Sequence, residues 1–192
     1  MEPENSFPAA SIDITAVYKE LLQEYDASNI GLYGCSAGGR IVGQTIAWIL
    51  EHELPPPGAI AILCSAPTSL GGNSNIITAA LEGRDPLVRR FDEGYFKGVQ
   101  AGNPLAFPGD SNEMLSRFPP VLLITSTRDY SLSPMVKMHS RLVRVGVSAD
   151  LHIFEGLRHA EFLNMYIPES RQAAWVVSKF FDKHLSTDRS AE

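Results

Sequence analysis

The sequence has few of the features that mark secreted, membrane or nucleic-acid-binding proteins. It contains only 2 cysteines among 192 residues, and 22 acidic side chains against 16 basic ones give a net charge of −6. A negative chain without a basic patch does not favour nucleic acid or an anionic membrane as a partner. No apolar run approaches the length of a bilayer span, and the first residues lack signal-peptide character. We therefore expect a cytoplasmic protein with one domain over residues 1–192.

The two cysteines do not indicate a metal site. Cys35 and Cys64 each lie at the end of an apolar stretch. We expect free thiols in a reducing cytosol; a disulfide is an alternative that no other feature of the sequence supports. Their spacing and the lack of partner ligands argue against a bound metal.

Apolar stretches that suit buried strands alternate with helical patterns along the chain. Strands are expected at 29–33, 59–64, 121–126 and 149–154, and helices at 9–25, at 37–52, from Ser133-Pro134 to Gly146, and from Pro168 onward. The last helix is expected to bury Ala174, Val177, Phe180 and Phe181. Residues 76–110 give weaker signals, and short helices are expected there with a surface loop around Asn103. The sequence thus predicts an α/β fold with a mostly parallel sheet of about four strands flanked by helices.

The most informative stretch is GCSAGG, which begins at Gly34 between an apolar strand and a long helical pattern. It contains the G-x-S-x-G pattern of a nucleophile elbow in the required strand–turn–helix context. Such a turn holds Ser36 at a strained backbone angle, and we expect Gly34 and Gly38, two positions before and after it, to keep strand and helix from clashing. Gly39 is a further glycine of the expected elbow. The N–H of Ala37 is then placed to bind an oxyanion. The alternative is a Gly/Ser-rich turn used only for packing or phosphate binding.

Two further residues can complete a catalytic set with Ser36. A serine hydroxyl needs a base to take its proton, and that base needs an acceptor behind it. Asp129 follows the strand that ends at Ser126, and His159 follows the strand that ends at Phe154. Because the carboxyl ends of parallel strands share one edge of the sheet, both are expected to reach Ser36. The chain order Ser, Asp, His is also the order found in α/β-hydrolases.

Each assignment has an alternative. An aspartate after a strand, such as Asp129, commonly serves only as a turn or helix-cap residue. Four other histidines compete with His159, but they lie in or at the ends of expected helices or within a strand: His52, His139, His184 and His152. Only His159 is expected on a loop at the carboxyl edge.

These segments together resemble the hormone-sensitive-lipase-like branch of the α/β-hydrolases, the bacterial carboxylesterases with a GDSAGG-type elbow. The resemblance covers nearly the whole chain, through residues 4–10, 34–39, 117–129 and 154–159. It implies hydrolysis of short-chain carboxylic esters through an acyl-enzyme on Ser36, with no cofactor. In this scheme His159 moves the proton, Asp129 orients His159, and Ala37 N–H binds the oxyanion.

The chain departs from the family pattern at two points. Cys35 replaces the aspartate common before the serine, which we regard as minor. More seriously, the HGGG-type motif that supplies most of the oxyanion hole is absent, since the chain begins where the family's fourth strand has just ended. Loss of a single oxyanion donor typically costs about 10²–10³ in turnover, so we expect weak activity unless another segment, such as the Gly71-Gly72 loop, supplies donors.

The same departure leaves the elbow strand, 29–33, at an edge of the sheet. An exposed apolar edge is a template for association, so we expect a homo-oligomer or another chain to cover it. The leading interpretation is a compact serine esterase that acts on a small-molecule ester. The main alternative is a truncated, catalytically inactive remnant that serves as a binding or assembly domain. An acyltransferase or peptidase using the same residues is a third.

Overall fold

The computed structural model describes residues 5–69, 71–87 and 94–185. Within these ranges one parallel sheet contains four strands: β1 (Gly31–Cys35), β2 (Ala59–Leu63), β3 (Val121–Ser126) and β4 (Ala149–Phe154). The spatial order follows the chain order, β1-β2-β3-β4, so β1 lies at one edge. The predicted α/β class and the sheet of about four parallel strands are confirmed. The first strand was expected two residues too early, because Asn29 ends a 3-10 turn and β1 continues to Cys35.

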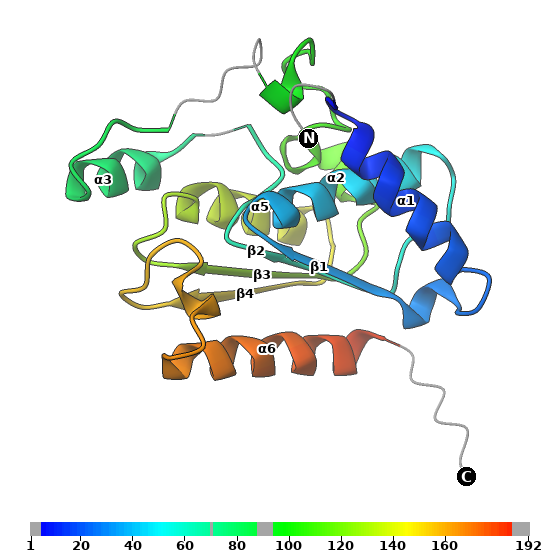
Figure 1. Cartoon of the computed structure of the whole chain (residues 1–192). Helices are drawn as coiled ribbons and strands as arrows, with labels where there is room; N and C mark the ends of the chain where they lie inside the picture. The colour runs from blue at the N-terminus through cyan, green and yellow to red at the C-terminus, as the bar shows by residue number, and fades with distance from the viewer. Residues whose placement is uncertain (1–4, 70, 88–93, 186–192) are drawn as a thin grey trace.

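Helices cover both faces of the sheet (Figure 1). The helices on one face are α1 (Ala9–Leu21), α2 (Ala37–Glu51) and α5 (Leu132–Arg144), and α6 (Pro168–His184) lies on the other. Shorter elements fill the connections: α3 (Asn73–Leu81), α4 (Asn112–Leu115) and the 3-10 turns Ala27–Asn29, Gly94–Phe96, Pro108–Asp110 and Glu161–Leu163. None of the helices within the described ranges has both the length and the apolar character of a membrane span.

The core forms two layers because alternate residues of a strand point to opposite faces. In β2, Ile60 and Ile62 join the apolar cluster beneath α1, α2 and α5. Ala59, Ala61 and Leu63 join the cluster beneath α6. All five are buried, which explains why the strand is a continuous apolar run rather than an alternating one.

Two helix predictions need correction. Ala174 is exposed, and it is Ala173 that packs inward together with Phe180, about two helical turns further along. Helix α5 begins at Leu132, so its N-cap residue is Ser131 rather than Ser133, and Pro134 lies in its first turn as expected. Gly146 follows the end of α5 at φ +83°, a left-handed conformation that favours glycine.

Candidate active site

Three side chains from distant parts of the chain meet at the carboxyl edge of the sheet. Ser36 Oγ lies 2.8 Å from His159 Nε2, and His159 Nδ1 lies 2.9 Å from Asp129 Oδ1. The three residues follow β1, β4 and β3, whose carboxyl ends share this edge. The arrangement is a continuous hydrogen-bonded relay from hydroxyl through imidazole to carboxylate.

The elbow holds the serine in the conformation that its motif predicts. Ser36 has φ 55° and ψ −118°, a combination that non-glycine residues rarely adopt. Its N–H donates to the carbonyl of Leu63 at the end of β2, at 2.9 Å, which ties the turn to the sheet. Ala37 opens α2, and the first N–H groups of a helix have no partner within the helix. The Ala37 N–H is therefore available to bind negative charge beside Ser36.

The glycines of the elbow are not equally constrained. A Cβ atom on Gly34 would lie 2.5 Å from backbone atoms of Gly38, and one on Gly39 would lie 2.9 Å from the carbonyl oxygens of Gly34 and Leu63. A Cβ atom on Gly38 would meet nothing within 4 Å. Close approach of strand and helix thus requires Gly34 and Gly39. The expectation that Gly38 prevents a clash is wrong.

Hydrogen bonds between the loops after β3 and β4 bring Asp129 and His159 together. Thr127 N–H donates to the carbonyl of Phe154 at 2.9 Å, and Gly156 N–H donates to Thr127 Oγ1 at 2.8 Å. Arg128 N–H, next to the carboxylate, donates to the carbonyl of Leu157 at 3.1 Å. Because the two loops are hydrogen-bonded to each other just before Asp129 and His159, these contacts fix the separation of the two residues.

Asp129 is fully buried, with 0 % of its surface exposed, and both of its carboxylate oxygens accept hydrogen bonds. Its Oδ1 accepts from the N–H of Ser131 at 2.8 Å, and its Oδ2 accepts from Thr125 Oγ1 at 3.3 Å. The Ser131 hydroxyl also lies 2.8 Å from Oδ1, but its one hydrogen is shared with the carbonyl oxygen of Cys64 at 2.5 Å. A carboxylate satisfied in this way stays in place and accepts the Nδ1–H of His159. The Nε2 of His159 is then the acceptor for the Ser36 hydroxyl.

Tyr130 is a member of the cluster that the sequence motifs did not indicate. Its ring stacks on the imidazole of His159, with centroids 4.3 Å apart and planes inclined by 26°. Its hydroxyl oxygen lies 3.1 Å from His159 Nε2. The only indication in the sequence is its position directly after Asp129.

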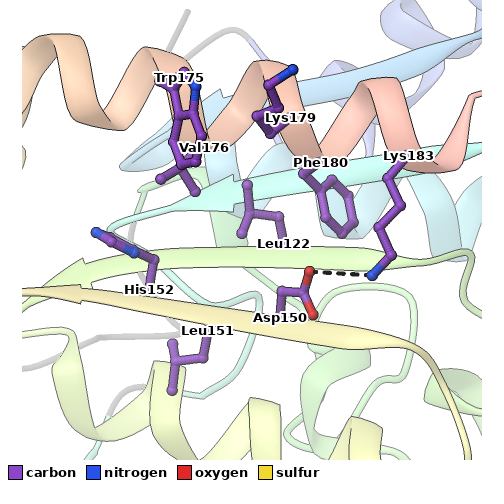
Figure 2. A pocket seen from close by; sticks show the side chains of 9 residues that line it. All are labelled: Leu122, Asp150, Leu151, His152, Trp175, Val176, Lys179, Phe180 and Lys183. Carbon is purple, nitrogen blue, oxygen red and sulfur yellow. Dashed lines mark ion pairs between the residues drawn. The ribbon is translucent and has the colours of Figure 1, made fainter.

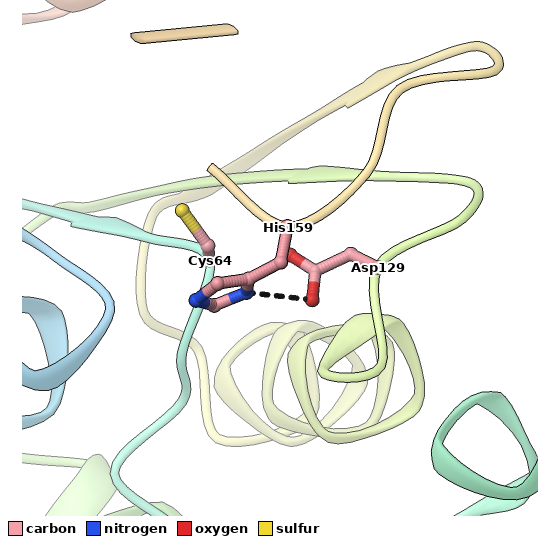
Figure 3. Close-up of side chains that lie close together, drawn as sticks. All are labelled: Cys64, Asp129 and His159. Atoms are coloured by element: carbon pink, nitrogen blue, oxygen red, sulfur yellow. Dashed lines mark hydrogen bonds and ion pairs between the residues drawn. The ribbon is translucent and has the colours of Figure 1, made fainter. Parts of the chain in front are cut away.

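The two cysteines lie beside the relay as free thiols. Their Sγ atoms are 2.7 Å apart, and this hydrogen bond lowers the pKa of the half-buried Cys35, whereas the same contact and burial raise that of Cys64. Figure 3 shows Cys64 next to Asp129 and His159, and one ligand atom from each lies within 4.8 Å of the others. Sequence spacing did not reveal this grouping. A metal there would have to displace the relay's hydrogen bonds, since both imidazole nitrogens and both carboxylate oxygens are already engaged.

The relay opens into a cavity of about 870 Å³. Its lining is mostly apolar and contains Asn5, Ala9, Ala10, Asp13, Ser36, Ala37, Arg40, Ile41, Gln44, Ser65, Leu87, Tyr95, Phe96 and Tyr130. This size falls within the range of small-molecule sites. The Gly71-Gly72 loop, suggested as a source of oxyanion donors, is not part of this lining; a Cβ on Gly72 would instead clash with the side chain of Ser133.

A second hollow, of about 270 Å³, lies between α6 and the strands β3 and β4 (Figure 2). It contains His152 and the ion pair of Lys183 with Asp150, whose nearest atoms are 3.9 Å apart. No member of the relay lines it. The remaining histidines also lie where the sequence placed them, His139 and His184 within helices and His52 at the end of α2.

Comparison with known proteins agrees with this geometry. Residues 1–163 match the family model described as the alpha/beta hydrolase fold. The chain belongs to this family. Among curated proteins, this α/β-hydrolase is 25% identical over 185 residues to an acetyl-hydrolase of Streptomyces hygroscopicus. The match includes 93% of this chain and 60% of the relative, so the chain spans about three fifths of that protein's length.

Solved structures place this α/β-hydrolase beside bacterial esterases. An esterase from the bacterial hormone-sensitive lipase family superposes with a TM-score of 0.84 at 29% identity, over 96% of this chain and 63% of the other. Esterase E25 superposes with a TM-score of 0.82 at 31% identity, over 97% of this chain and 58% of the other. An esterase/lipase from an uncultured bacterium superposes with a TM-score of 0.84 at 26% identity, over 95% of this chain and 62% of the other. The resemblance to hormone-sensitive-lipase-like esterases is confirmed.

Proposed function

We propose that this α/β-hydrolase cleaves short-chain carboxylic esters through an acyl-enzyme on Ser36. The observation that carries the proposal is the relay itself, with 2.8 Å from Ser36 Oγ to His159 Nε2 and 2.9 Å from His159 Nδ1 to Asp129 Oδ1. Nucleophile, base and orienting acceptor are therefore in contact before any substrate binds.

The reaction follows from this geometry. Ser36 Oγ attacks the ester carbonyl and its proton passes to His159 Nε2, while the charge of Asp129 stabilises the imidazolium. The oxyanion of the tetrahedral intermediate accepts a hydrogen bond from Ala37 N–H. The intermediate then expels the alcohol, which takes the proton from Nε2. A water molecule then attacks the acyl-enzyme by the same steps, and the carboxylic acid is released. None of these steps requires a cofactor.

The substrate class rests on two observations. The mostly apolar cavity at Ser36, about 870 Å³, accommodates a small acyl group together with its alcohol. The curated relative is an acetyl-hydrolase and the structural neighbours are esterases, which favours acetyl and other short acyl esters.

The test compares hydrolysis of p-nitrophenyl acetate by the wild type and by Ser36→Ala. A matched control is Ser140→Ala, an exposed serine of α5 whose hydroxyl bonds only its own helix. We expect Ser36→Ala to lose at least about 10³-fold in kcat, and Ser140→Ala to match the wild type. Equal rates for wild type and Ser36→Ala would reject the proposed esterase activity. They would favour the alternative, a catalytically inactive binding or assembly domain.

We propose further that association covers the edge of β1, with a second copy of this chain as the partner. β1 pairs only with β2 among the described strands, and Tyr33 on it is 69% exposed. Unpaired strand edges with exposed apolar side chains favour pairing with another chain. Light scattering coupled to gel filtration should give about twice the mass of the 21.0 kDa chain. A mass of one chain at every concentration would contradict this.

A further inference from the structure

One side chain in the cluster around Ser36 takes no part in the three-residue relay. Tyr130 is half-buried and lines the same cavity as Ser36. Its ring lies over the face of the His159 imidazole, 4.3 Å between centroids, and its hydroxyl oxygen is 3.1 Å from Nε2. A phenol in this place is a hydrogen-bond donor next to the atom that moves the proton.

The stacked geometry determines which atoms the Tyr130 hydroxyl can hydrogen-bond. The lone pair of an imidazole nitrogen lies in the plane of the ring, whereas a stacked ring approaches from the face. Ser36 Oγ, at 2.8 Å, can therefore take the lone pair of Nε2. In the free protein the hydroxyl of Tyr130 is hydrogen-bonded with Ser36. Once Ser36 Oγ has bonded to the acyl carbon, the hydroxyl hydrogen can turn to an oxygen atom that arrives beside Nε2.

The surroundings keep this donor protonated. Burial raises the pKa of Tyr130, and the negative charge of Asp129 acts in the same direction. A hydrogen bond with Ser36 acts in the opposite direction, but the pKa stays above its usual value. At neutral pH the phenol is thus neutral, and it can donate but does not ionise.

We propose that Tyr130 is a further catalytic residue, whose hydroxyl donates a hydrogen bond to the ester oxygen of the departing alcohol. The inference rests on the proposed esterase function. His159 must return its proton from Nε2 to that ester oxygen, so the oxygen has to come within hydrogen-bond reach of Nε2. A hydroxyl 3.1 Å from the same nitrogen reaches the same point.

The step balances without a second proton donor. The bond between the carbonyl carbon and the leaving oxygen breaks, and its electron pair stays on that oxygen. The proton on Nε2 moves to the oxygen, and Tyr130 keeps its own proton throughout. Its contribution is to stabilise the negative charge that develops before the proton arrives.

This role predicts a dependence on the leaving group. p-Nitrophenolate leaves readily without stabilisation, whereas the alkoxide of ethanol does not. Tyr130→Phe retains the stacked ring and removes only the hydroxyl. We expect it to lower kcat/KM, which reports acylation, by about 30- to 100-fold for ethyl acetate and by less than about threefold for p-nitrophenyl acetate.

The experiment measures kcat/KM for the acetates of p-nitrophenol, phenol, trifluoroethanol and ethanol. The variants are Tyr130→Phe, Tyr130→Leu and the control Tyr166→Phe, a tyrosine that is 98% exposed. Tyr166→Phe should match the wild type. Tyr130→Leu also removes the stacked ring and should slow all four esters, since His159 loses its support.

The outcomes separate the inference from the function on which it rests. A loss in Tyr130→Phe that grows as the leaving alcohol becomes less acidic supports the inference. An equal loss on all four esters, or none on ethyl acetate, overturns it while leaving the esterase in place. If the wild type shows no hydrolysis that depends on Ser36 with any ester, the proposed function is rejected and this inference with it.

Discussion

Replacing the buried carboxylate by an amide tests how the relay sets the state of His159. In Asp129→Asn only one of the two oxygen positions can remain an acceptor. Ser131 N–H lies 2.8 Å from Oδ1 and can only donate, so the amide oxygen should occupy that position. The amide NH₂ then faces Thr125 Oγ1, which can turn and accept. The Nδ1–H of His159 therefore keeps its acceptor.

The expected loss of kcat/KM in Asp129→Asn follows from the negative charge that the substitution removes. Asp129→Asn preserves the tautomer of His159 and removes only the negative charge that stabilises the imidazolium. A hydrogen bond to a charged group exceeds a neutral one by about 1–2 kcal/mol, and the charge in a buried site adds more, so we expect about 2–3 kcal/mol. That corresponds to about 30- to 150-fold in kcat/KM. Asp129→Ala removes the acceptor itself and should cost about 10⁴-fold, the scale of a histidine held in the wrong tautomer.

The assay is kcat/KM for p-nitrophenyl acetate at pH 7.5, with thermal unfolding as a check on folding. Asp150→Asn, an exposed aspartate of β4, is the matched control and should be unchanged. If Asp129→Asn is as slow as Asp129→Ala, the amide has turned its NH₂ toward His159 and the argument from Ser131 is wrong. A variant as fast as the wild type would show that the charge plays no part.

Three further predictions concern the elbow, the core and the thiols. Gly39→Ala should lower the free energy of unfolding by about 1–3 kcal/mol, because its Cβ would lie 2.9 Å from backbone carbonyl oxygens. Gly38→Ala places its Cβ in open space and should change the free energy of unfolding by less than about 1 kcal/mol. Equal losses of the two variants in urea unfolding would refute this distinction. Burial raises the pKa of Tyr18 to about 12 against about 10 in the unfolded chain, so its contribution to stability is complete below pH 10 and is lost between pH 10 and 12. Urea unfolding over that window should show a steeper fall for the wild type than for Tyr18→Phe, and parallel curves would count against it. Iodoacetamide should modify the half-buried Cys35, whose pKa is lowered, before the buried Cys64, as peptide mass mapping can show; the reverse order would contradict the assignment of their pKa shifts.

The sheet and the elbow could be predicted because their physical causes are local. A strand buried on both faces is a continuous apolar run, as in residues 59–63 and 121–126, and this pattern needs no knowledge of its neighbours. The conformation of Ser36 follows from its own motif. The placement of Asp129 and His159 at one edge followed from the rule that parallel strands end together.

Other features depend on contacts between segments distant in sequence. The backbone bond from Arg128 to Leu157 and the stacking of Tyr130 on His159 join the loops after β3 and β4, and no periodicity marks them. The difference between Gly38 and Gly39 in the space for a Cβ atom cannot be predicted from the sequence either, since it depends on which side of α2 faces β2. The error at Ala174 is of the same kind, because adjacent helical residues point about 100° apart and two neighbouring alanines look alike in sequence.

Activation of Ser36 can be tested most directly by covalent trapping with a fluorophosphonate, which reacts with a serine hydroxyl that a base has activated. Intact-mass measurement and peptide mapping should find one adduct on Ser36, formed at least about 10³-fold more slowly in His159→Ala. A wild type that gains no adduct, or one whose Ser36 reacts no faster than in His159→Ala, would contradict it.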